Sequence, residues 1–150
     1  MKLRNFFPVL FILIACQNSP TKAQNQTKTL VGVLENDKAI LTLDKSKLLV
    51  AYNANLLKLS GIDGKFTEVS IKTTSDKQYF LVFKGNTYSS SFIVTADNST
   101  LYVIPTISCT TSECASEEFG CTPKASGGAC WPCNNKGKCT KTVTDGSMIE

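Results

Sequence analysis

The sequence predicts an α+β protein in which one helix packs on an antiparallel sheet of four to five strands, followed by a small disulfide-rich tail. Residues 45–60 place apolar side chains at helical spacing, whereas the segments that follow them alternate polar and apolar residues, as strands do. Six of the seven cysteines lie within residues 109–139, where branched aliphatic residues are scarce. The length of 150 residues suits one ordinary domain with attachments.

The first part of the body is predicted to be strand followed by helix. Residues 30–34 and 39–43 are short apolar runs separated by a polar, turn-like cluster, and they indicate one or two strands. Asp44 is placed to cap a helix over residues 45–60, and Gly61 is placed to end it. The apolar stripe of this helix consists of Leu48, Tyr52, Leu56 and Leu59, widened by Leu49 and Leu57.

Four strands in a meander are predicted after the helix. Val69 and Ile71 alternate with polar residues, so the first of these strands is expected to have one face in water. Residues 78–84 are apolar on both faces, as in a central strand, and Pro105 marks the end of the last strand. The remaining two strands are predicted at residues 88–96 and 101–104.

The order of a strand, a helix and four strands over residues 30–107 resembles the cystatin-like layout, in which a curved sheet grips one helix. The resemblance concerns topology and implies the fold alone, because one fold can carry many functions. It adds one functional hypothesis, that the protein inhibits an exported enzyme through loops at one end of the sheet.

The amino terminus has the pattern of an export signal. Lys2 and Arg4 precede an apolar run over residues 6–15. A membrane-spanning helix needs about 20 residues, so this run is too short to be one. A basic segment followed by an apolar run of this length is typical of a signal peptide.

The sequence Leu-Ile-Ala-Cys of residues 13–16 resembles the lipobox of bacterial lipoproteins at all four positions. By this resemblance, residues 1–15 form a signal peptide that is cut before Cys16. Cys16 receives a diacylglycerol on its sulfur, and its new amino group is acylated, with palmitate as the expected acyl chain. Several acyl chains hold a protein on a membrane almost irreversibly. An ordinary secretory signal cut after Ala23 is the alternative.

Residues 16–29 are predicted to be a lipidated, flexible tether, since residues 17–29 contain no aromatic or branched aliphatic side chain to bury. By resemblance to the enterobacterial sorting rule, Gln17 implies transfer to the outer membrane. The lack of acidic residues just after Cys16 favours the periplasmic face and leaves surface display open. From lipobox to Cys-rich end, the chain resembles small Gram-negative envelope lipoproteins of unknown activity, with the membrane as the expected partner.

Composition excludes several classes of function. The sequence contains no histidine, so Ser-His-Asp and Cys-His catalysis and histidine-ligated metal sites are excluded. The net charge is +4 without a basic stripe interleaved with aromatic residues, so no nucleic-acid partner is expected. Neither catalytic residues nor a cofactor is predicted. The leading hypothesis is a non-catalytic envelope lipoprotein that binds an unknown envelope protein or cell-wall partner.

The tail, residues 108–150, is predicted to be held together by three disulfides. An exported segment with this density of cysteines is typical of a disulfide framework, whose pairing the sequence leaves open. Each disulfide contributes about 2 to 4 kcal/mol, which replaces a core that this segment is too poor in apolar residues to form. The cysteines are Cys109, Cys114, Cys121, Cys130, Cys133 and Cys139.

Alternative hypotheses remain for the tail. Cys130 and Cys133 have the two-residue spacing of a thioredoxin-type redox pair, which would make the protein a thiol-disulfide enzyme. Four tail thiolates, these two among them, would also suit zinc, but oxidation during export opposes this and no metal is predicted. Trp131 is interpreted either as packed against cystines or as an exposed contact residue. The glutamates interpreted as solvated surface are Glu113, Glu117 and Glu118.

Overall fold

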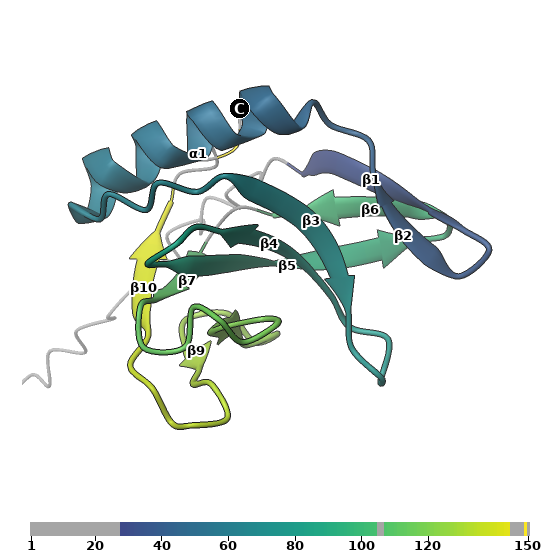
Figure 1. Cartoon of the computed structure of the whole chain (residues 1–150). Coiled ribbons are helices and arrows are strands. Elements are labelled where there is room, and N and C mark those ends of the chain that lie inside the picture. The colour runs from purple at the N-terminus through teal and green to yellow at the C-terminus, as the bar shows by residue number, and fades with distance from the viewer. Residues whose placement is uncertain (1–27, 105–106, 145–148, 150) are drawn as a thin grey trace, which may run out of the picture.

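The computed structural model describes residues 28–104, 107–144 and 149, which form one helix, a large antiparallel sheet and the Cys-rich tail (Figure 1). The predicted signal peptide, the lipobox and nearly all of the tether lie outside the described residues. The elements are β1 (Thr29–Glu35), β2 (Lys38–Leu41), α1 (Lys45–Ser60), β3 (Glu68–Thr73), β4 (Tyr79–Lys84), β5 (Ser89–Asp97), β6 (Thr100–Val103), β7 (Ile107–Thr111), β8 (Thr122–Pro123), β9 (Cys130–Trp131) and β10 (Thr140–Val143).

The helix α1 has the predicted bounds and the predicted caps. The Asp44 carboxylate accepts hydrogen bonds from the backbone N–H groups of Ser46 and Lys47, at 2.9 and 3.1 Å. Gly61 adopts a left-handed φ of 72°, and its N–H donates to the Leu57 carbonyl at 2.9 Å. Among the described residues, no helix is both long and apolar enough to span a membrane.

The strands after α1 pair in the predicted meander. β3, β4, β5 and β6 are consecutive antiparallel neighbours. β6 then pairs with β1, and β1 pairs with β2 through a two-residue turn. The turn residues Asn36 and Asp37 have φ values of 49° and 62°, as a tight hairpin turn requires.

The prediction of four to five strands is wrong, since the described part of the sheet has eight. Two of the additional strands come from the tail: β7 pairs with β5, and β10 pairs with β7. Because β4 covers one edge of β5, both β6 and β7 lie along its other edge, at residues 94–97 and 89–91 of β5. The tail is therefore joined to the body by strand pairing.

Gly32 lets the first hairpin approach β3. It lies at an irregularity in the pairing of β1 with β6. A Cβ at this position would collide with the Ile40 carbonyl oxygen and lie 2.8 Å from Ile71 Cδ1. The lack of a side chain at residue 32 therefore permits the close packing that brings β1, β2 and β3 together.

The main core lies between α1 and one face of the sheet. Tyr52 is fully buried, with its ring centroid 4.1 Å from that of Phe83 and 5.3 Å from that of Phe92. Its hydroxyl lies 2.5 Å from Ser90 Oγ, so the buried polar group has a partner. Other buried members of this core are Val31, Leu48, Leu56, Phe66, Val69, Leu81, Val94, Leu101, Val103 and Ile149.

Burial of Tyr52 makes the free energy of unfolding vary with pH in the alkaline range. Burial raises the pKa of Tyr52 above its ordinary value of 10.0, and hydrogen bonds from hydroxyls of β5 and β7 offset this only in part. The unfolded chain therefore loses the Tyr52 proton at a lower pH than the folded chain does. The contribution of Tyr52 to the free energy of unfolding is fully present below pH 10.0 and is lost as the pH rises through the folded-state pKa.

The substitution Tyr52→Phe is expected to abolish this part of the pH dependence, because phenylalanine has no proton to lose. Denaturant unfolding of both proteins on either side of pH 10.0 measures it. The two proteins differ only at residue 52, so the difference between their two curves isolates Tyr52. Parallel loss of stability in the two proteins would contradict the expectation.

The Cys-rich tail covers the face of the sheet opposite α1 (Figure 1). The ring of Phe119 packs edge-on against that of Phe80 in β4, with centroids 5.9 Å apart. Ser91 Oγ in β5 donates a hydrogen bond to the Cys121 carbonyl at 2.6 Å. The two-sided apolar pattern of β4 follows from this arrangement, since one face of the strand contacts the main core and the other contacts the tail.

Candidate functional site

The six tail cysteines form three interleaved disulfides, which confirms the predicted framework. The Cα atoms of the pairs are 5.8, 6.3 and 5.9 Å apart, within the range for disulfides. Each of the first three cysteines pairs with the cysteine three places later in the series. The pairs are Cys109–Cys130, Cys114–Cys133 and Cys121–Cys139.

This pairing separates the two cysteines of the predicted redox motif. Cys130 is bonded to Cys109 in β7, and Cys133 is bonded to Cys114. A thioredoxin-type pair instead cycles between two thiols and a disulfide joining them. In this structure the two motif cysteines anchor neighbouring parts of the tail to different segments.

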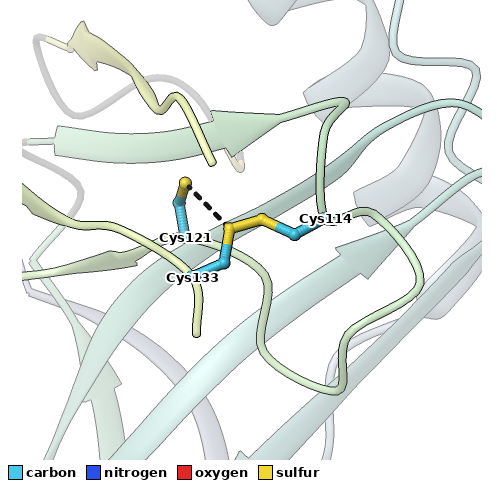
Figure 2. A group of neighbouring side chains, drawn as sticks. All are labelled: Cys114, Cys121 and Cys133. Atoms are coloured by element: carbon cyan, nitrogen blue, oxygen red, sulfur yellow. Dashed lines mark hydrogen bonds between the residues drawn. A yellow bond between two sulfur atoms is a disulfide. The ribbon is translucent and has the colours of Figure 1, made fainter. Parts of the chain in front are cut away.

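Three sulfur atoms from two disulfides gather at the centre of the tail (Figure 2). The Sγ atoms of Cys114, Cys121 and Cys133 all lie within 4.8 Å of one another, and all three residues are buried. Cys121 Sγ is 3.7 Å from Cys133 Sγ, which belongs to the other disulfide. Zinc binds thiolates, so these sulfurs would have to be reduced before they resembled a zinc site.

A groove with a cavity volume of about 440 Å³ lies beside this cluster, between the tail and the β3–β4 hairpin. The hairpin forms one wall, and residues 117–120, 122 and 132–134 of the tail form the other. The lining combines two aromatic rings with carboxylates and amides. It consists of Thr74, Gln78, Phe80, Glu117, Glu118, Phe119, Gly120, Thr122, Pro132, Cys133 and Asn134.

Hydrogen bonds fix the hairpin wall of the groove. The Asp76 carboxylate lies between its neighbours, accepting from Thr74 Oγ1 at 2.5 Å and from Gln78 Nε2 at 2.8 Å. The hydrogen bond from Thr74 is the main reason that the pKa of Asp76 is lowered. These contacts hold Gln78 at the rim of the groove.

Two glutamates that the sequence suggested were solvated make contacts at the tail wall, although Glu118 is mostly exposed. Glu117 Oε2 accepts a hydrogen bond from the backbone N–H of Asn134 at 3.2 Å. Glu118 Oε1 lies 3.5 Å from Lys72 Nζ of β3, an exposed ion pair that contributes little stability. The glutamates therefore join the tail segments to each other and to the sheet.

Lys84 at the end of β4 ties the tail to the sheet. Its ammonium group donates to the Ala115 carbonyl at 2.8 Å and to the Glu117 carbonyl. Burial lowers the pKa of Lys84, and the nearby charge of Lys72 acts in the same direction.

The substitution Lys84→Met is expected to loosen residues 114–119, because it removes the donor shared by two carbonyls while keeping the apolar stem. Loss of such a donor costs about 1 to 3 kcal/mol. Hydrogen exchange of the amides in this segment measures the effect. Lys47→Met, at an exposed position of α1, is the matched control, and equal exchange in the two variants would contradict the expectation.

Trp131 lies next to the groove, on the small hairpin formed by β8 and β9. Its side chain is 56% exposed, and Lys124 Nζ lies 3.9 Å from the ring centroid. This distance is typical of a cation–π contact. Trp131 does not line the groove, but the following residue, Pro132, does.

No family model, curated protein or solved structure matches the chain.

The candidate site combines predicted and unpredicted residues. The structure brings the six predicted cysteines together, with Cys133 in the groove lining. The predicted lipidation site, Cys16, lies outside the described residues. Gln78, Phe119 and Asn134 were not predicted, because they come from three separate segments and no shared motif connects them.

Proposed function

We propose that the protein is a membrane-anchored envelope lipoprotein that acts as a non-catalytic binding module, with the groove beside the cystine cluster as its binding site. The observation that carries the proposal is the preformed groove of about 440 Å³, a size typical of ligand sites. The proposed anchor is lipid on Cys16, and the proposed location is the periplasmic face of the outer membrane, with surface display as the alternative.

The rigidity of the groove walls supports a binding role. Disulfides fix the tail wall, and the Asp76 hydrogen bonds fix the hairpin wall. A site that is already ordered before a ligand arrives loses less conformational entropy on binding. The disulfide pairing of Cys130 and Cys133 with other partners also favours this proposal over thiol-disulfide catalysis by that motif.

The lining favours a peptide as the ligand. Phe80 and Phe119 offer apolar contact, whereas Gln78 and Asn134 offer amides, which both donate and accept hydrogen bonds. A peptide presents alternating apolar side chains and polar amide groups and matches this mixture. In the cell envelope, such a peptide is supplied either by the stem peptides of the cell wall or by a loop of a protein partner.

Titration of the isotopically labelled full chain in detergent micelles with soluble muropeptides tests the cell-wall source. Amide NMR signals of residues 117–122 and 132–134 are expected to shift, whereas those of α1 stay in place. Asn134→Ala is expected to weaken binding because it removes an exposed amide from the groove, and Leu57→Ala on the outer face of α1 is the control.

Photo-crosslinking in intact cells tests the protein source. A photoreactive residue at position 118, on the groove, is expected to form a discrete adduct with a partner protein, whereas one at position 57 is not. Absence of both muropeptide shifts and groove-specific adducts would contradict the proposed function.

A further inference from the structure

We propose that the tail is a thiol-disulfide relay, in which a thiol that cleaves the Cys121–Cys139 disulfide causes the Cys114–Cys133 disulfide to be cleaved in turn. The proposal rests on the distance of 3.7 Å between Cys121 Sγ and Cys133 Sγ, which belong to two different disulfides. Figure 2 shows the Cys121 sulfur facing the Cys133 sulfur. The relay differs from the Cys130–Cys133 redox pair considered above.

Accessibility determines where the relay starts. Cys139 is only partly buried, whereas Cys121 is 0% exposed, and Cys114 and Cys133 are 2% and 5% exposed. An incoming thiolate therefore reaches Cys139 Sγ before any other sulfur of the two disulfides. Its attack forms a mixed disulfide with Cys139 and leaves the Cys121 thiolate inside the tail.

The second step is an exchange within the protein. The Cys121 thiolate attacks Cys133 Sγ, forming a Cys121–Cys133 disulfide and breaking the Cys114–Cys133 disulfide. The electron pair of the broken bond leaves on Cys114 Sγ, which then takes a proton. Such exchange needs a thiolate next to a disulfide sulfur, and here the two sulfurs are already in contact.

The atoms balance with a monothiol as the only co-reactant. One molecule of thiol ends on Cys139 as a mixed disulfide, and its proton ends on Cys114. A second molecule of thiol can release Cys139 as a free thiol and leave as the oxidised dimer. The Cys109–Cys130 disulfide takes no part, because neither of its sulfurs belongs to the group of three that lie within 4.8 Å of one another.

The exchange alters the groove, since Cys133 is one of its lining residues. In the oxidised protein Cys133 is bonded to Cys114, and after the exchange it is bonded to Cys121 on the other side of the cluster. We therefore expect ligand affinity to change with the thiol redox state of the surroundings. This consequence rests on the proposed function, whereas the relay itself does not.

Limited reduction of the full chain tests the relay. The protein is treated with less than one equivalent of glutathione, quenched with acid, labelled with N-ethylmaleimide under denaturing conditions and mapped by peptide mass spectrometry. The expected products carry glutathione on Cys139, label on Cys114 and a new Cys121–Cys133 linkage. Label on Cys121 with an intact Cys114–Cys133 linkage in every modified molecule would overturn the proposal.

A second test starts the relay without any reductant. The substitution Cys139→Ser leaves one odd thiol, which the relay distributes between Cys121 and Cys114, with part of the protein showing the Cys121–Cys133 linkage. In the matched variant Cys130→Ser, the odd thiol is expected to stay on Cys109. If the Cys139→Ser protein is labelled on Cys121 alone, the relay is wrong, whatever the groove binds.

Discussion

The substitution Phe83→Ala is expected to lower the free energy of unfolding by about 3 to 5 kcal/mol, the range for truncating a buried phenylalanine. Phe83 is fully buried, and its ring contacts that of Tyr52, which holds α1 on the sheet. Truncation leaves a cavity at the centre of the aromatic cluster. Denaturant unfolding of the two proteins measures the difference.

A conservative variant separates the loss of volume from other effects. Phe83→Leu keeps most of the buried apolar volume, so we expect a loss of about 1 kcal/mol. Val50→Ala on the outer face of α1, where the residue is 72% exposed, is expected to change stability much less. A Phe83→Ala protein as stable as the Val50→Ala protein would show that the aromatic cluster is not the core.

Replacing both Cys121 and Cys139 by alanine is expected to destabilise the folded state by about 3 kcal/mol, the loop-closure entropy of a disulfide of this span. The disulfide closes a loop with a sequence separation of 18 residues. The unfolded chain gains freedom when the disulfide is removed, and the cystine cluster loses two members. Urea unfolding measures the change in stability.

The loss of stability on replacing Cys121 and Cys139 is expected to be concentrated in the tail. Hydrogen exchange of residues 117–122 should become faster, whereas that of β4 should change only with global stability. Ser126→Ala, at an exposed position of the same tail, is the control. A double variant whose tail exchanges as slowly as that of the control would contradict a stapling role for this disulfide.

Local sequence signals predicted the helix and the strands of the body. Leu48, Tyr52 and Leu56 of the predicted stripe are buried, and Asp44 and Gly61 form the predicted caps. Leu57 and Leu59, which were also placed in the stripe, are instead 50% and 47% exposed, because they lie toward the solvent side of the helix. The two-sided apolar pattern of β4 correctly indicated a central strand. These elements were predictable because their signals lie within a few residues of one another.

The tail strands were not predicted, because the density of cysteines indicated a disulfide framework and the strand propensity of the tail was not weighed. β7 and β10 are rich in β-branched residues, which favour strands. Their pairing with each other and with β5 depends on contacts between distant segments. The groove was unpredictable for the same reason, since its walls meet only after the tail has docked on the sheet.

We propose an exported, lipid-anchored protein that presents a binding groove stapled by three disulfides. The most direct test is the intact mass of the protein from its native membrane fraction, measured after alkylation with and without prior reduction. We predict a chain that begins at Cys16, carries acyl groups and gains six alkyl groups only after reduction. A mass without acyl groups, or cysteines that are alkylated before reduction, would contradict the claim.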